Sequence, residues 1–110
     1  MTVDESLKAL LLSCCNEVAR LKYNGKADEF ITYQIVTVLD SNYADDNNET
    51  IDHSYRIDIY SKGNYMTLLT NVKAALKAAG WHSIEIDLET YEQDTGYFHV
   101  PVDAKFLEVK

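Results

Sequence analysis

The spacing of apolar residues changes once between residues 51 and 80, and this change constrains the fold more than any other feature. Apolar and polar residues first alternate, which is the pattern of a strand with one buried face. His53, Tyr55, Ile57 and Ile59 share one face, and Ser54, Arg56, Asp58 and Tyr60 share the other. After residues 61–64, a spacing of three and four predicts a helix, carried by Tyr65, Leu69, Val72, Leu76 and Ala79 and ended by Gly80. A strand that passes directly into an amphipathic helix indicates an α+β domain.

The N-terminal segment predicts a second helix over residues 3–23. Thr2 and Glu5 have the spacing of a capping box, which places the start of this helix. Leu7, Leu11, Cys14, Val18 and Leu21 then recur with the helical period. Asn24 and Gly25 supply the residue types that end a helix.

Three further segments have the composition or alternation of strands. Residues 30–39 are rich in β-branched residues and are apolar on both faces, which favours a central strand or one covered on both sides. Residues 83–89 alternate, with Ile84, Ile86 and Leu88 directed inward and the acids outward. Residues 97–109 form the last strand, and Pro101 lacks a backbone donor, which predicts an edge or a bulge there.

The predicted order is helix, strand, strand, helix, strand, strand. This order predicts one α+β domain over residues 1–110, with a four-stranded antiparallel sheet and two helices on one face. The other sheet face is polar and is expected to be exposed or used for contact. The acidic loop 40–50 is longer than a hairpin requires, so we expect it to be functional or mobile.

Charge and cysteine usage exclude several classes of protein. The net charge is −8, and the segments 40–50 and 85–94 carry four and five acids without a base. Duplex binding needs clustered bases, so sequence-specific nucleic-acid binding is not expected. Cys14 and Cys15 are adjacent and poorly placed for a disulfide, which favours a reducing compartment. The N-terminus lacks the features of a signal peptide, and no apolar run is long enough for a membrane span, so no membrane association is expected.

No motif for catalysis or cofactor binding is present. His53, His82 and His99 have no short ligand spacing and are interpreted as strand or surface histidines. The loop fails the EF-hand pattern, because Asp45 stands where glycine is needed and Ile51 where glutamate is needed. The four glycines are isolated, which excludes a phosphate-binding loop. We therefore expect no metal, no cofactor and no enzymatic activity.

Three segments resemble the tail terminator proteins of long-tailed bacteriophages and prophages, a family also called tail completion or minor tail proteins. These segments are the strand at residues 53–62, the helix end at residues 76–81 and the last strand at residues 97–106. The order of helices and hairpins is similar over nearly the whole chain.

The resemblance implies a structural protein of the virion tail or neck, present in the bacterial cytoplasm during assembly. Such a protein forms a ring, usually of six copies, that caps the tail tube and receives the head–tail connector. Its partners would be other copies of the chain, the tail tube protein and the connector, with a monomer as the state before assembly. Acidic clusters lining the ring would repel passing DNA. The candidate contact residues are Tyr43, Asp45, Asp46, Arg56, Asp58 and Tyr60.

Other functions remain open from the sequence. One is another neck, head–tail joining or tail-assembly protein with a similar small fold. A different class is a small cytosolic α+β ligand-binding module or enzyme subunit, with Trp81, His82 and Tyr97 lining a pocket. A weaker alternative is an acidic protein that mimics DNA.

Overall fold

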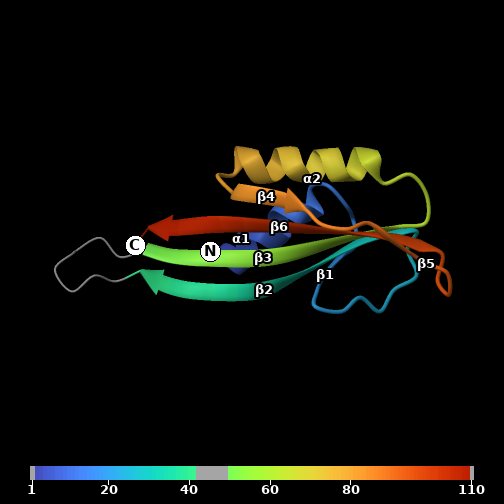
Figure 1. Ribbon diagram of the computed structural model, residues 1–110, viewed down its shortest axis with the longest axis horizontal. Helices are drawn as coiled ribbons and strands as arrows, with labels where there is room; N and C mark the ends of the chain where they lie inside the picture. Colours follow the sequence, from blue (N-terminus) through green and yellow to red (C-terminus); the bar gives the residue numbers. More distant parts are fainter. Residues whose placement is uncertain (1, 42–49, 110) are drawn as a thin grey trace.

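The computed structural model describes residues 2–41 and 50–109 (Figure 1). Two helices and six strands follow in this order: α1 (Val3–Leu12), β1 (Val18–Arg20), β2 (Glu29–Ser41), β3 (Thr50–Ser61), α2 (Met66–Ala78), β4 (His82–Ile86), β5 (Thr90–Glu92) and β6 (Tyr97–Val109). The three long strands β2, β3 and β6 run along the longest dimension of the molecule. Neither helix of the described chain is long and apolar enough to cross a membrane.

The sheet has the order β1-β2-β3-β6-β4, and β5 pairs with the opposite end of β6. β1 runs parallel to β2, whereas all other pairs are antiparallel. The α+β class is therefore confirmed, but the predicted four-stranded antiparallel sheet is wrong. The sheet is mixed and has six strands, because two strands of three residues each are added to the predicted four. Strands this short are below the length at which periodicity is informative.

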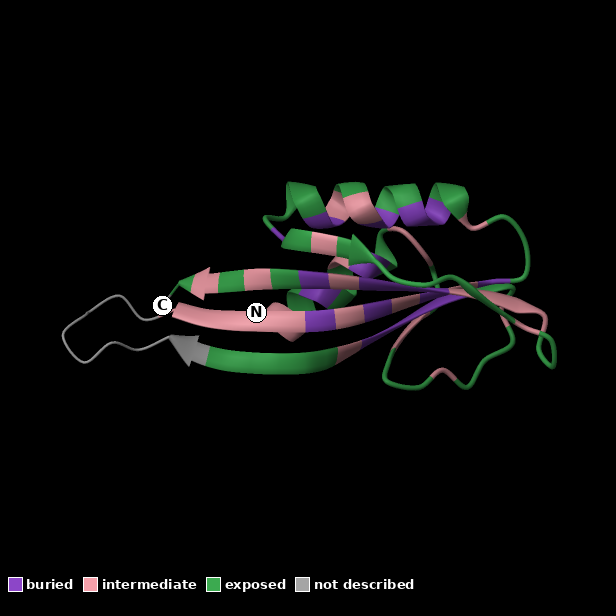
Figure 2. Ribbon diagram, in the orientation of Figure 1, coloured by how far each residue is buried: buried purple, intermediate pink, exposed green. Residues whose placement is uncertain are grey.

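Both helices pack on the same face of the sheet, as the sequence predicts. Leu7 and Leu11 of α1 and the stripe of α2 meet the inward residues of β2, β3 and β6 (Figure 2). The members of this core with no exposed surface are Leu7, Leu11, Ile31, Ile57, Ile59, Val72, Leu76 and Val102. Because the strand alternation places Tyr55, Ile57 and Ile59 inside, Arg56, Asp58 and Tyr60 are directed to the face without helices.

Helix α1 ends at Leu12, so the predicted extension to residue 23 is wrong. The capping box between Thr2 and Glu5 is confirmed. At the other end, the Ser13 hydroxyl donates to the carbonyl of Leu10, a local bond that competes with further helix. Ile31 N then donates to Glu17 O at 2.9 Å and draws the following residues into β1. The pairing of residues 18–20 with β2 therefore decides their structure, although Val18 also fits the helical spacing of the apolar residues before it.

Gly80 ends α2 with a φ of +92°, as predicted, and Trp81 N donates to Leu76 O at 3.0 Å. Beyond this turn, the strand predicted at residues 83–89 is present as β4, but its predicted burial is only partly correct. Ser83 has a φ of +52°, and the register with β6 shifts between His82 and Glu85. Ile86 lies opposite the buried Val102 in the register, so it keeps the predicted direction toward the helix side, but it is exposed. Leu88 lies beyond the end of β4 and is also exposed, so only Ile84 packs against the core.

Strand β6 lies between β3 and β4, so the predicted edge position of Pro101 is wrong. Residues 102–105 of β6 pair with β4, and residues 97–99 pair with β5. Pro101 lies between these two stretches, where β6 changes partner, and its carbonyl accepts from Asp87 N at 2.9 Å. The backbone N–H that proline lacks would therefore lie at a break in the hydrogen-bond ladder, where neither β4 nor β5 pairs with β6.

Asp4 connects the start of α1 to the sheet. Its carboxylate accepts from the hydroxyls of Tyr55 at 2.9 Å and Tyr33 at 3.4 Å, and it lies 3.3 Å from Arg20 Nε. Burial, and then the Asp4 carboxylate, raise the pKa of both Tyr33 and Tyr55. Both phenol groups therefore stay protonated and act as donors to this carboxylate.

Replacing Asp4 with alanine is expected to lower the free energy of unfolding by about 1–3 kcal/mol, because two buried hydroxyls lose their acceptor. Urea denaturation followed by circular dichroism measures the change. Lys8→Ala, at an exposed position of the same helix, is the matched control and should change stability little. Equal denaturation midpoints for the Asp4 variant and the control would contradict this role of Asp4.

Candidate assembly surface

The sheet face opposite the helices is divided into three zones. One end carries an aromatic row formed by Tyr23, Phe30, Tyr60 and His99. The middle carries an ion-pair cluster formed by Arg56, Asp87 and Asp103. The other end, where β2 ends and β3 begins, is the distal ribbon, formed by residues 35–41, 50–54 and 105–109.

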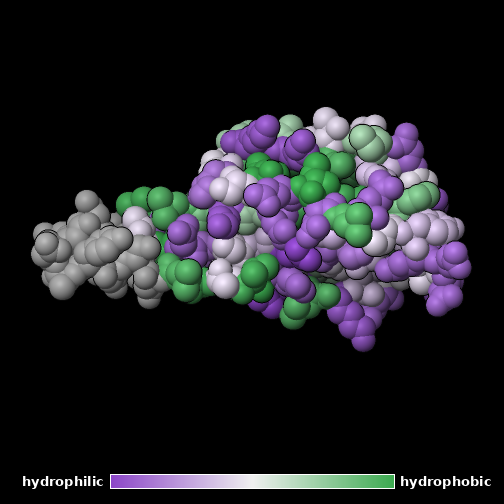
Figure 3. Space-filling view, viewed as in Figure 1, coloured by the Kyte–Doolittle hydropathy of each residue, from purple (hydrophilic) through white to green (hydrophobic). Residues whose placement is uncertain are grey.

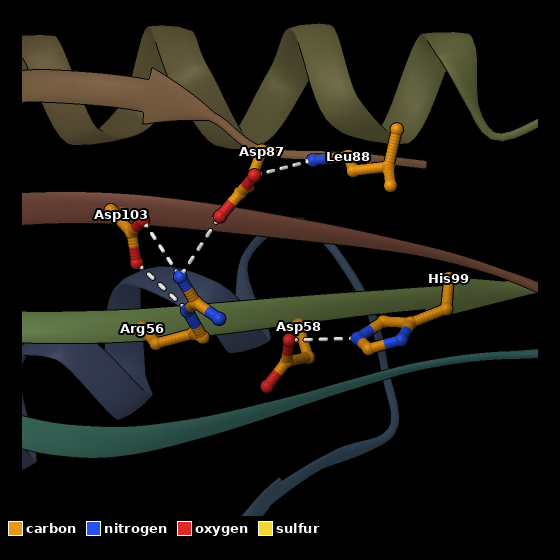
Figure 4. Close-up of polar contacts among 6 residues, drawn as sticks. All are labelled: Arg56, Asp58, Asp87, Leu88, His99 and Asp103. Atoms are coloured by element: carbon orange, nitrogen blue, oxygen red, sulfur yellow. Dashed lines mark hydrogen bonds and ion pairs between the residues drawn. The ribbon is translucent and has the colours of Figure 1, made fainter. Parts of the chain in front are cut away.

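The ion-pair cluster is built by three strands or their connections (Figure 4). Arg56 of β3 lies opposite Asp103 of β6 in the register, and its Nε and Nη2 donate to the two carboxylate oxygens at 2.9 and 3.0 Å. Nη2 also donates to Asp87, just after β4, at 3.1 Å. The hydrogen bonds to Asp103 raise the pKa of Arg56, which keeps the guanidinium charged. About a third of the Arg56 side chain stays exposed, so it is available to a partner as well.

Asp58 and Tyr60 are engaged within the chain. Asp58 Oδ1 lies 2.8 Å from His99 Nε2, and the Asp58 side chain is only 14% exposed. The His99 ring stacks on Tyr60 with a centroid distance of 4.4 Å. Both residues lie on the predicted face, but their polar and aromatic groups already have partners.

The aromatic row is covered by the connection between β1 and β2. Tyr23 stacks on Phe30 at 4.1 Å, and Phe30 stacks on Tyr60 at 4.5 Å. The hydroxyl of Tyr97 donates to Ala27 O at 2.6 Å and fixes the same connection. Burial raises the pKa of Tyr60. A loop, and not a helix, therefore covers this end of the sheet face. In the sequence, this cover is indicated only by the aromatic residues Tyr23, Phe30 and Tyr97.

A shallow hollow of about 650 Å³ lies between the ion-pair cluster and the distal ribbon. Its lining is mostly polar and comprises Gln34, Val36, Thr37, Ser54, Arg56, Glu85, Asp103 and Lys105 among others. Arg56 and Lys105 bring positive charge to a surface on which acids predominate. Because the lining also holds the acids Glu85 and Asp103, this chemistry suits a polar side chain of a partner protein.

The distal ribbon extends beyond the helices (Figure 1), and its exposed apolar residues lie on both faces of the strands, of which Figure 3 shows one. Its exposed large apolar residues are Ile35, Val36, Val38, Leu39, Leu107 and Val109. β1 pairs only with residues 31–33 of β2, so the expectation of a central or doubly covered strand at 30–39 is wrong for its second half. In this second half, the apolar residues on both faces therefore mark exposed surface and not a covered strand.

The structure brings Arg56, Asp58 and Tyr60 together on one face, and their role as contact residues stays a prediction. Tyr43, Asp45 and Asp46 lie outside the described residues. Within residues 2–41 and 50–109, no group of three His, Cys, Asp or Glu side chains is placed to hold a metal ion.

The residues proposed to line a ligand pocket do not converge. Trp81 packs on Tyr55 and Phe106 on the helix side of the sheet. Tyr97 lies against Phe30 on the opposite side. His82 is exposed, and its Nδ1 lies 3.0 Å from the Ser83 hydroxyl. The pocket that the alternative function requires is therefore not formed by these three residues.

Neither a protein-family model nor a curated protein matches the chain. Among solved structures, a chain from the virion of a native gene transfer agent particle has a similar fold, with a TM-score of 0.50 and 8% sequence identity. The similarity covers 93% of this chain and 86% of that chain. At this identity the likeness establishes a shared fold, which extends over nearly the whole length of both chains.

Proposed function

We propose that the chain is a structural protein of a phage-type virion and that it works there as a tail terminator. In this role it forms a ring, of six copies as in the tail terminator family, that caps the tail tube and receives the head–tail connector. The observation that carries the proposal is the fold shared with a gene transfer agent virion chain over 93% of the present chain. The three sequence segments that resemble tail terminators support the narrower role.

The exposed surface supports a function based on contact. The distal ribbon presents apolar side chains on both faces, although such groups are usually buried or reserved for a partner. Beside it, the polar hollow places Arg56 and Lys105 within reach of polar groups on another protein. We propose that these two neighbouring surfaces contact other virion proteins and that the chain catalyses no reaction.

The acids of residues 85–94 support a placement near the DNA path. Glu85 and Glu89 are exposed, whereas Asp87 is paired with Arg56. Negative charge lining a channel would repel the DNA backbone and leave it free to pass. A ring structure with this segment on its outer rim would remove this part of the proposal.

Deletion of the gene tests the role directly. We expect electron microscopy to show tails of uncontrolled length and heads without tails, because tube growth would no longer be capped. The wild-type gene supplied in trans should restore normal particles. Tails of normal length that fail to join heads would instead indicate another neck or joining protein. Normal particles from the deletion strain would overturn the proposal of a virion role.

A further inference from the structure

We propose that the free edge of β2, residues 35–39, is a seam at which a second copy of this chain docks head to tail. The docking segment of that copy is 84–91, which contains the exposed residues Ile86, Leu88 and Tyr91. The inference rests on the proposed function, because it supplies the contact between neighbouring subunits of the ring.

The edge of β2 is open over this stretch. β1 pairs with residues 31–33, and the last bond between the two segments runs from Leu21 N to Tyr33 O at 2.9 Å. From residue 34 onward, no strand of the described chain pairs with the outer side of β2. An open strand edge is a template for another chain, and proteins usually protect it with charges, proline or a cover.

No charge, proline or cover protects residues 35–39, and the one irregularity in this stretch is a register shift with β3 between Ile35 and Thr37. The sequence of the stretch is Ile-Val-Thr-Val-Leu, without a charge or a proline. Val36 is 55% exposed and Leu39 is 61% exposed, so the stretch is not covered by the helices. An uncharged and apolar open edge is expected where a protein pairs with a partner rather than where it avoids one.

The distribution of charge identifies the partner as another copy. The net charge of −8 makes two copies repel each other unless opposite charges meet at the contact. Residues 20–27, beside β1, carry Arg20, Lys22 and Lys26 without an acid. Residues 85–94, on the opposite side of the sheet, carry five acids without a base. The two segments lie on opposite sides of the sheet (Figure 1). They are complementary in charge, and each side also exposes apolar side chains.

The strand directions agree with a head-to-tail contact. β2 and β6 run in the same direction, because both are antiparallel to β3. β4 and β5 are antiparallel to β6 and therefore to β2. A second copy that is shifted across the sheet without being turned over presents its 84–91 segment antiparallel to β2. Such a heterologous contact closes into a ring when the rotation between copies is suitable.

The double variant Val36→Lys/Val38→Lys tests the seam. Both side chains are exposed, so the fold should be retained, as circular dichroism and thermal denaturation would verify. We expect self-association, measured by analytical ultracentrifugation over a range of concentrations, to weaken about tenfold or more, since two charges are buried in an apolar contact. The change from −8 to −6 in net charge would favour association through any other surface.

The matched control is Leu12→Lys/Met66→Lys, which adds the same two charges at exposed apolar positions of the two helices. The control should associate like the wild-type chain. If the wild-type chain associates and both double variants associate equally well, the seam is overturned and the ring stays as proposed. A wild-type chain that is monomeric up to its solubility limit also overturns the seam, whereas the gene deletion decides the virion role separately.

A charge exchange tests the head-to-tail arrangement. Lys22→Glu/Lys26→Glu makes residues 20–27 acidic, and Glu89→Lys/Asp94→Lys weakens the acidity of the opposite side. Each variant alone should associate more weakly than the wild-type chain. In the first variant two acidic segments meet, and in the second the basic segment meets a less acidic one. An equal mixture of the two should recover association in pairs, since the unchanged acidic segment 85–94 of the first variant meets the unchanged basic segment 20–27 of the second. Absence of recovery would overturn the head-to-tail contact and favour a symmetric pairing of two β2 edges.

Discussion

Trp81→Ala is expected to lower the free energy of unfolding by about 3–5 kcal/mol, because it removes a large buried side chain and leaves a cavity. Trp81 is 6% exposed and follows the turn that ends α2. Its ring meets that of Tyr55 of β3 edge-on, with centroids 5.7 Å apart, and lies tilted against that of Phe106 of β6, with centroids 5.3 Å apart. The residue therefore joins the end of a helix to two strands of the sheet.

Chemical denaturation monitored by tyrosine fluorescence or circular dichroism measures this loss. Met66→Ala is the matched control, since it removes a large apolar side chain that is exposed at the start of the same helix. We expect the control to change stability by no more than about 0.5 kcal/mol. A loss of similar size in both variants would show that Trp81 does not join α2 to the sheet as described.

Arg56→Glu is expected to destabilise the chain by about 2 kcal/mol, since partly exposed charged hydrogen bonds are lost and like charges are brought together. The new carboxylate would lie beside Asp87 and Asp103, which Arg56 binds in the native chain. Urea denaturation gives the change, and added salt should recover part of it by screening the repulsion. No dependence of the loss on salt would argue against electrostatic repulsion as its cause.

Arg56→Met separates the two contributions, because it removes the hydrogen bonds without adding a negative charge. We expect its loss to be smaller than that of Arg56→Glu. The comparison also matters for function, since Arg56 is both a proposed contact residue and a link between β3, β6 and the β4–β5 connection. An assembly defect in a variant that keeps its fold supports the contact role, whereas a defect that follows the loss of stability does not.

The sequence located the secondary structure well where the hydrophobic period extends over many residues. β3, α2 and β6 lie close to their predicted ranges, and Gly80 ends α2 as expected. The sequence did not predict β1 and β5, because these strands have three residues each and form only where a neighbouring strand pairs with them. The predicted burial also failed after Ser83, because β4 ends at Ile86 and leaves Leu88 outside the strand, and because Ile86 is exposed although it faces the same side as the buried Val102.

The candidate site was predicted in part. The alternation of β3 placed Arg56, Asp58 and Tyr60 on one face, and this placement is correct. Their partners could not be predicted, because Asp103 and His99 lie 47 and 41 residues away in the sequence. The cover formed by residues 21–28 was equally invisible, since Tyr97 reaches Ala27 across 70 residues.

The sequence by itself determined that this chain is an α+β protein with one apolar and one polar face on its second long strand, because alternation reports the two sides of a strand directly. Only the tertiary structure decided which surfaces are free. It pairs the outer edge of β2 with β1 over only three residues and leaves the second half of that edge open, and it leaves Leu88 exposed. Exposure depends on which segments meet in space, and a one-dimensional pattern does not contain that information.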